Sequence, residues 1–242
     1  MLATESKLPV EGGPEKRRYI RGMFAAIAPS YDRLNRIISL NLDGHWRREG
    51  IRRLGWERVP GGTYLDLCAG TLDFSAELSG QPGFHGQVVG ADFVPEMLRL
   101  GRQKAAALRP VTADALELPF ADGSFEGAMV GWGMRNLTDL DAGLREVARV
   151  LKHGARLVIV EASIPEWQPL RVLFLFYFEQ ILPRIGAFLS RHSTAYRWLP
   201  ESTRAFPSPE VVAEQMAQAG FREVGVTRFL GGVTTLHVGT RA

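Results

Sequence analysis

Three acidic residues stand at the ends of successive apolar segments, and their spacing could build a nucleoside site. Asp66 lies where the first segment ends, Asp92 ends the second, and Asp114 follows the third. The carboxyl ends of parallel strands share one edge of a sheet, where ligands bind. A carboxylate placed like Asp92 can accept hydrogen bonds from both ribose hydroxyls, and one placed like Asp114 can accept from an adenine amino group. The spacing predicts an adenosine site.

A tight turn of small residues, Ala69-Gly70-Thr71, follows the first segment. Small residues let a ligand approach the backbone N–H groups of such a turn, so we expect Asp66 and Gly70 to contact the cofactor. Cys68 and Leu72 stand where a pyrophosphate-binding fingerprint would have glycines. An adenosine ligand without pyrophosphate favours S-adenosylmethionine over NAD. An ordinary strand-to-helix turn is the alternative interpretation.

The elements that must position these residues alternate regularly between strand and helix. Such alternation predicts an α/β fold with a doubly wound parallel sheet. Residues 17–242 form a single predicted domain after a disordered tail over 1–16, with a helical addition over 17–60 and a helical insertion over 166–206. The predicted strands are 64–67, 87–92, 109–113, 127–132, 156–161, 221–229 and 233–240, and the helices between them include 95–107, 139–152 and 210–219.

Composition excludes several classes of protein. The 242 residues are 45% hydrophobic and 23% charged, with a net charge of +3 and no dense basic run beyond 16–18, so a nucleic-acid partner is not expected. A single cysteine excludes a disulfide framework and a cysteine-based zinc site. We predict no metal and a reducing, cytoplasmic location. No uninterrupted apolar run reaches the ~18 residues of a membrane span.

Residues 167–189 are apolar on nearly every helical face, although a few charged residues interrupt them. This composition is typical of a groove wall for a long apolar substrate, or of a peripheral contact with the inner face of a membrane. A buried helix or the face of a homodimer explains the same pattern.

Longer motifs resemble the ubiquinone/menaquinone biosynthesis C-methyltransferases, and the similarity runs from about residue 17 to 241. The matching stretches are Met23 to Asn35, His45-Trp46-Arg47-Arg48, Leu118-Pro119-Phe120, Gly133 to Thr138, Arg145 to Leu151, Tyr196 to Ser202, Phe206-Pro207 and Gly231 to His237. Arg135-Asn136 and Tyr196 to Ser202 are the most specific to the family. The resemblance implies a class I methyltransferase with a seven-stranded, mostly parallel sheet.

The resemblance also implies S-adenosylmethionine as cofactor and C-methylation of a polyprenyl quinol ring, with demethylmenaquinol as the broader family activity. By position, the residues implied at the cofactor are Thr71, Asp92, Asp114 and Ala115, with Gly131 near it. Those implied at the substrate hydroxyl are Arg135, Asn136 and Tyr31. The head group, naphthoquinol or benzoquinol, stays open.

One departure from the family pattern concerns the cofactor. Leu72 replaces the second glycine of Gly-Thr-Gly-Asp, and we expect its branched side chain to lie where the methionine end of the cofactor should pass. On this basis a non-catalytic family member that organises a quinone-biosynthesis assembly is one alternative. A methyltransferase acting on another small hydroxylated metabolite is the second.

The expected chemistry needs no nucleophilic residue, because a sulfonium methyl is already electrophilic. Arg135 could stabilise a substrate phenolate, since guanidinium stays charged at working pH. It is therefore a poor general base, and a water held by Arg135 and Asn136 suits that role better. His45 is a rival base.

Overall fold

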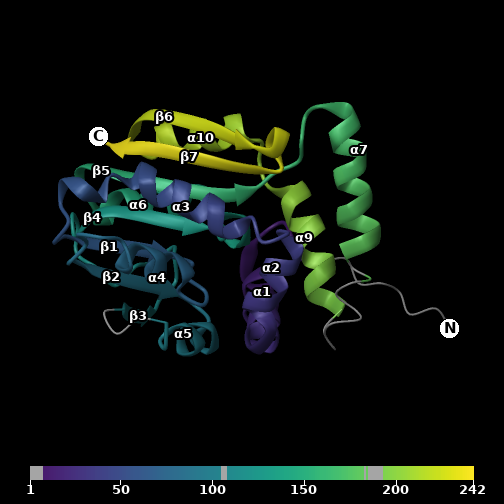
Figure 1. The fold of residues 1–242 in the computed structure, drawn as a ribbon, viewed down its shortest axis with the longest axis horizontal. Helices are drawn as coiled ribbons and strands as arrows, with labels where there is room; N and C mark the ends of the chain where they lie inside the picture. The colour runs from purple at the N-terminus through teal and green to yellow at the C-terminus, as the bar shows by residue number, and fades with distance from the viewer. Residues whose placement is uncertain (1–7, 105–107, 183, 185–192) are drawn as a thin grey trace.

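The computed structural model describes residues 8–104, 108–182, 184 and 193–242, and its centre is a seven-stranded sheet (Figure 1). Residues 185–189 of the apolar segment lie outside the described residues, as does the side chain of Tyr196. The strands are β1 (Thr63–Leu67), β2 (Gln87–Asp92), β3 (Leu108–Thr112), β4 (Phe125–Gly131), β5 (Leu151–Ala162), β6 (Phe221–Phe229) and β7 (Thr234–Arg241).

The sheet has the order β3-β2-β1-β4-β5-β7-β6. β1 to β5 are parallel, whereas β7 lies antiparallel to both β5 and β6. The predicted doubly wound, mostly parallel sheet is therefore confirmed. The chain winds outward from β1 through β3 and returns to β4 on the other side of β1. A topological switch point of this kind is where such sheets bind ligands.

Helices cover both faces of the sheet because alternate strand residues point to opposite sides. Leu65 and Leu67 of β1 pack in one core cluster, and Tyr64 packs in the other. The first cluster includes side chains of α6 (Leu140–Val150) and α10 (Pro209–Gln218). The second includes side chains of α3 (Asp43–Leu54), α4 (Asp73–Ser79) and α5 (Pro95–Gly101).

The remaining helices gather beyond the carboxyl ends of the parallel strands (Figure 1). They are α1 (Gly13–Ile27), α2 (Tyr31–Ile38), α7 (Gln168–Phe176), the π-helical turn η4 (Tyr177–Ile181) and α9 (Ser193–Ala205). In sequence, α1 and α2 precede the sheet, whereas α7, η4 and α9 lie between β5 and β6. Helices from two separate parts of the chain thus meet over one edge of the sheet.

The predicted tail over 1–16 is too long. α1 begins at Gly13 with Pro14 in its first turn, where the missing N–H of proline costs nothing. Leu8 is 9% exposed and packs in a cluster with Ile20, Met23 and Trp198. Burial of Leu8 and the early helix start thus order part of the segment that its polar composition assigned to the tail.

Leu72 is part of the core, so the expectation that it obstructs the cofactor is wrong. Its backbone is left-handed, with φ 63° and ψ 31°, and its side chain is fully buried. A Cβ on Gly90 of β2 would lie 2.1 Å from Leu72 Cδ2, and one on Gly101 would lie 2.8 Å from Leu72 Cγ. The two glycines leave the room that the leucine fills.

We predict that Gly90→Ala destabilises the protein through this contact. Because the added methyl overlaps Leu72 Cδ2, the free energy of unfolding should fall by about 1–3 kcal/mol in denaturant titrations. In a Leu72→Ala background the same substitution should cost less than about 1 kcal/mol, since the obstructing atoms are gone. Gly225→Ala in β6, where a Cβ meets nothing within 4 Å, is the control. Equal costs in both backgrounds would contradict the packing described.

Candidate functional site

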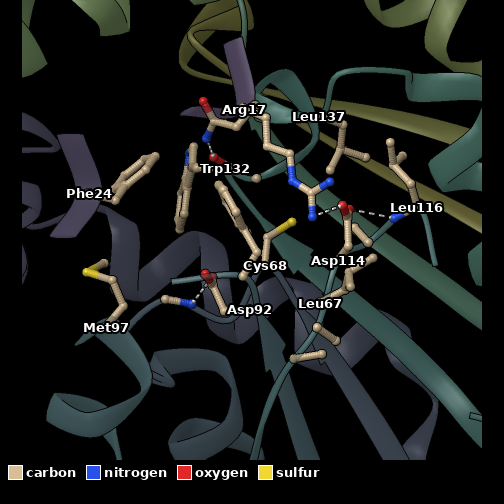
Figure 2. Close-up of a pocket in the computed structure, with 18 of the residues that line it drawn as sticks. Arg17, Phe24, Leu67, Cys68, Asp92, Met97, Asp114, Leu116, Trp132 and Leu137 are labelled. Carbon is tan, nitrogen blue, oxygen red and sulfur yellow. Dashed lines mark hydrogen bonds and ion pairs between the residues drawn. The ribbon is translucent and has the colours of Figure 1, made fainter. Parts of the chain in front are cut away.

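Two cavities adjoin at the carboxyl edge of the sheet. The first, here the nucleoside cavity, lies over the ends of β1, β2 and β4 and is lined by residues such as Gly70, Asp92, Asp114 and Gly131 (Figure 2). The second, here the apolar cavity, measures about 330 Å³ and lies among side chains of α1, α2, α7 and α9. Phe24, Tyr31 and Trp132 line both cavities and form their shared wall.

Asp92 is held at the end of β2 by backbone donors. Its Oδ2 accepts a hydrogen bond from Gly70 N at 2.8 Å, and Oδ1 accepts from Val94 N at 2.8 Å. The residue is 8% exposed, and burial raises the pKa of its carboxyl to about 6 although the backbone donors act in the opposite direction. The carboxylate is thus fixed in orientation at the nucleoside cavity, as its predicted role at a ribose requires.

Asp114 lines the same cavity beneath α1. Its Oδ1 accepts from Leu116 N at 3.0 Å, and its Oδ2 pairs with Arg17 Nη2 at 2.8 Å (Figure 2). Lys16, the neighbour of Arg17, is buried and donates from Nζ to Leu137 O at 2.7 Å. Burial lowers the pKa of this amine to about 8. α1 is therefore anchored at the cavity by two cationic side chains that no motif had singled out.

Small residues shape the floor of the nucleoside cavity. Gly70 has a left-handed φ of 51°, which favours glycine, and Ala115 also lines the cavity. A Cβ on Gly131 would lie 2.6 Å from Phe74 Cε2. The structure thus brings five of the residues predicted at the cofactor to one cavity: Gly70, Asp92, Asp114, Ala115 and Gly131.

Asp66 and Thr71 are not among the lining residues of either cavity. Asp66 Oδ2 accepts from Ser75 N at 2.9 Å and from Ser75 Oγ at 2.6 Å, which ties β1 to the start of α4. Thr71 Oγ1 donates to Asp32 Oδ1 at 2.5 Å. In this structure the two side chains stabilise the turn through these hydrogen bonds. Their direct contact with a cofactor stays a prediction.

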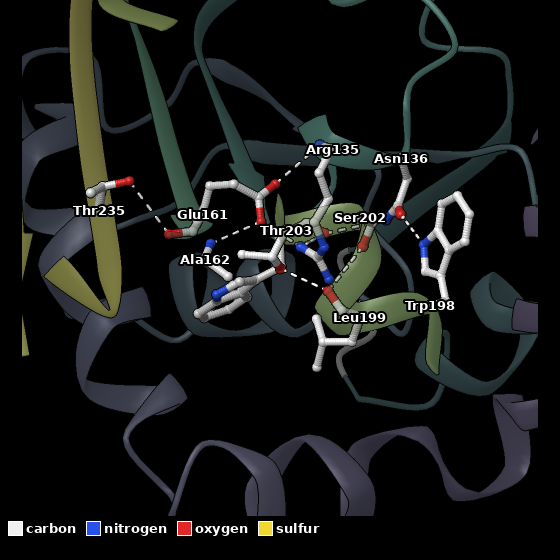
Figure 3. Close-up of polar contacts among 10 residues, drawn as sticks. Arg135, Asn136, Glu161, Ala162, Trp198, Leu199, Ser202, Thr203 and Thr235 are labelled. Atoms are coloured by element: carbon white, nitrogen blue, oxygen red, sulfur yellow. Dashed lines mark hydrogen bonds and ion pairs between the residues drawn. The ribbon is translucent and has the colours of Figure 1, made fainter. Parts of the chain in front are cut away.

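The three residues predicted at the substrate divide between the cavities. Arg135 lines the apolar cavity and Asn136 lines the nucleoside cavity, while Tyr31 belongs to the shared wall. Trp198 Nε1 donates to Asn136 Oδ1 at 2.9 Å, so the amide of Asn136 is held from α9 (Figure 3). Burial raises the pKa of the Tyr31 hydroxyl. The arrangement places Arg135 and Tyr31 where a substrate in the apolar cavity would meet a ligand in the other.

His45 is poorly placed for the role of base. Its side chain is exposed, its ring packs edge-on against Phe229 with 6.3 Å between ring centroids, and it lines neither cavity. Glu161, in contrast, was missed by the sequence interpretation. It lies at the carboxyl end of β5, fully buried against Arg135. An acid at a strand end was the signal that found Asp66 and Asp92, and it would have found Glu161 as well.

The sheet order and the cavity at its switch point define the class I S-adenosylmethionine-dependent methyltransferase fold. A solved SAM-dependent methyltransferase from Thermotoga maritima aligns with a TM-score of 0.63 over 92% of this chain and all (100%) of that chain, at 17% identity. Another from Aquifex aeolicus gives a TM-score of 0.54 over 75% of this chain and 83% of that one, at 18% identity. These similarities confirm the predicted fold.

Sequence comparison gives the family. The model of the ubiE/COQ5 methyltransferase family matches residues 13–241. The chain is 42% identical over 233 residues to a ubiquinone/menaquinone biosynthesis C-methyltransferase UbiE of Geobacter sp. strain M21, covering 94% of this chain and 98% of the other. It is 43% identical over 224 residues to a demethylmenaquinone methyltransferase of Thermus thermophilus, covering 90% and 100%.

The chain therefore belongs to the ubiE/COQ5 methyltransferase family, as its motifs predicted, and it is a methyltransferase. In the part of the chain that the structure describes, no helix is long and apolar enough to cross a membrane.

Asp66 gives a prediction for stability against pH. Burial raises the pKa of its carboxyl to about 7, above the ordinary value of 3.8. The protonated form is favoured in the folded state, so this contribution to stability is complete below pH ~4 and is lost as pH rises through 7. Asp66→Asn stays neutral at every pH. Its free energy of unfolding should therefore gain on that of the unsubstituted protein by up to ~4 kcal/mol between pH 4 and 8, at about 1.4 kcal/mol per pKa unit.

Denaturant titrations at several pH values measure this difference. Gly225→Ala, which changes no titratable group and whose Cβ would meet nothing within 4 Å, is the control and should show a flat difference. A flat difference for Asp66→Asn would mean that the pKa of the Asp66 carboxyl is the same in the folded and unfolded protein, which would contradict the prediction.

Proposed function

We propose that the protein transfers the methyl group of S-adenosylmethionine to a ring carbon of a polyprenyl quinol, converting demethylmenaquinol to menaquinol. The supporting observation is the wall of Phe24, Tyr31 and Trp132 that the nucleoside cavity and the apolar cavity share. The relative from Geobacter is named a ubiquinone/menaquinone biosynthesis C-methyltransferase, and the relative from Thermus a demethylmenaquinone methyltransferase. A ring held against that wall would face the cofactor.

In the nucleoside cavity, Asp92 would accept from the ribose hydroxyls and Asp114 from the adenine amino group. The ion pair between Asp114 and Arg17 would open when adenine takes its place; the Arg17 side chain is 59% exposed and free to swing outward. Backbone at Gly70 and Gly131 would approach the ligand closely. When bound, S-adenosylmethionine supplies an electrophilic methyl carbon.

In the apolar cavity, Arg135 is the one cationic side chain among the described lining residues. It would stabilise the phenolate of the quinol, which makes the neighbouring ring carbon nucleophilic. That carbon would then be able to take up the electrophilic methyl group that S-adenosylmethionine supplies, with the electrons of the S–CH₃ bond left on sulfur. The ring then loses a proton to water and becomes aromatic again. Holding the two reactants in line contributes several kcal/mol to such a step.

The apolar cavity would hold the start of the prenyl chain, and exposed apolar residues surround its mouth. Leu40, Leu173 and Leu230 line the cavity and are 74%, 65% and 56% exposed; we call them the rim. Phe176, 57% exposed, follows Leu173 on α7. Apolar patches of this kind mark interaction sites. We propose that the rim rests on the inner face of the cytoplasmic membrane, from which the quinol enters.

Nothing in the structure favours the other two functions. The scaffold interpretation depended on Leu72 blocking the cofactor, and Leu72 lies in the core. A small hydroxylated metabolite would leave most of a cavity with so apolar a lining unfilled.

Calorimetric titration with S-adenosylmethionine tests the cofactor site. The unsubstituted protein should bind saturably, and Asp92→Ala should weaken binding at least ~100-fold, since two hydrogen bonds to a charged acceptor contribute about 1.5–3 kcal/mol each. Asp122→Ala is the surface control. The same preparations, given demethylmenaquinol, should form menaquinol only where the cofactor binds. Cofactor binding without methyl transfer to any polyprenyl quinol would refute the substrate assignment.

Co-sedimentation with vesicles of phosphatidylethanolamine and phosphatidylglycerol tests the rim. Leu173→Asp should lower the bound fraction severalfold, because a carboxylate opposes entry into the bilayer. Val211 on α10 is 42% exposed and lines neither cavity. The control variant Val211→Asp should therefore bind vesicles as the unsubstituted protein does. If Leu173→Asp instead dissociates a dimer in the absence of lipid, the rim is an interface between two copies of the chain.

A further inference from the structure

Glu161 binds both the backbone and the side chain of Arg135. It is 0% exposed, and its Oε2 accepts from the backbone N of Arg135 at 3.2 Å. Its Oε1 accepts from Ala162 N at 2.9 Å and pairs with Arg135 Nη1 (Figure 3). A single carboxylate at the end of β5 therefore holds both the main chain and the side chain of Arg135.

Only one of the three guanidinium nitrogens of Arg135, Nη1, donates hydrogen bonds to the described residues, so Nε and Nη2 have no partner among them. Nη1 makes a second bond, to Trp132 O at 2.6 Å, so the protein fixes this nitrogen from two directions. The side chain is only 9% exposed, and its Nε is buried without a hydrogen-bond partner among the described residues. An unsatisfied buried N–H on a charged group is costly and calls for a partner. A ligand in the apolar cavity, which Arg135 lines, could supply this hydrogen-bond partner.

Glu161 itself lines neither cavity. It therefore acts on a ligand only through Arg135. We propose that Glu161 is a positioning residue: it holds Nη1 against Trp132 O and leaves the unpartnered edge of the guanidinium, Nε–H and Nη2–H, to donate to the quinol oxygen next to the methylated carbon. This assignment rests on the proposed function for its substrate, and on the contacts above for its geometry.

Removal of the carboxylate would have two opposing effects. The positive potential at the substrate would rise, which favours the phenolate and shifts the pH dependence of kcat/KM to lower pH. The guanidinium would also lose its fixed orientation, which lowers kcat at every pH. A positioning role predicts that the second effect dominates, and a role limited to charge compensation predicts the first alone.

Steady-state kinetics of Glu161→Gln separate the two roles. We expect kcat to fall about 10- to 100-fold, as loss of a supporting contact commonly does, with KM for the quinol and the affinity for S-adenosylmethionine changed less than ~3-fold. Glu161→Asp keeps the charge but is one methylene shorter, and it should lose kcat similarly. Added to Arg135→Lys, Glu161→Gln should have no further effect. The matched control is Glu126→Gln on β4, which likewise removes the carboxylate of an ion pair, here with Lys152.

A second readout does not depend on the substrate. The Nε–H signal of Arg135 in a ¹⁵N NMR spectrum, assigned by its loss in Arg135→Lys, should shift and broaden in Glu161→Gln but not in Glu126→Gln. An unchanged signal, or a kcat equal to or above that of the unsubstituted protein, would overturn the proposal. If the unsubstituted protein methylates no quinol, the proposed function fails, and the NMR comparison still decides whether Glu161 positions Arg135.

Discussion

The site depends on the hydrogen bond between Gly70 N and the carboxylate of Asp92. It joins the turn after β1 to the end of β2, and Val94 N holds the other oxygen of the same carboxylate. Two neighbouring strand ends are thereby locked at a fixed separation, with the carboxylate facing the cavity. Because Asp92 is almost fully buried, any other arrangement would leave a desolvated carboxylate or backbone N–H without a partner. The nucleoside cavity is consequently formed before any ligand arrives.

The sequence was most informative where one period of hydrophobicity dominates. The bounds predicted for β2 and β6 agree with the structure, since both are alternating or apolar runs between clear turn residues. α5 was predicted too long, to residue 107, whereas it ends at Gly101. The backbone of that glycine approaches Thr71 O so closely that a Cβ would lie 2.3 Å from it. Contacts of this kind join distant parts of the chain, and periodicity holds no record of them.

Side-chain direction was the main limit at the site. Leu72 was expected to face the cofactor, but its left-handed backbone turns the side chain into the core. Arg135 and Asn136 were expected to act together, yet they lie in the 3₁₀ turn η3 (Met134–Asn136), where successive side chains diverge by about 120°. They therefore face different cavities. The motif indicated two neighbouring residues, and the local helix type determines which cavity each of them lines.

The two cavities also differ in where they open. The nucleoside cavity has the exposed Arg17 at its edge, whereas the apolar cavity opens at the rim of Leu40, Leu173 and Leu230. Under the proposed function, separate mouths would let a spent water-soluble cofactor exchange while the lipid substrate stays in place, so that neither would have to bind first. With the rim on a membrane, as proposed, successive turnovers would need no desorption from the bilayer, and throughput would depend on two-dimensional diffusion of the lipid rather than on repeated capture of the protein from solution.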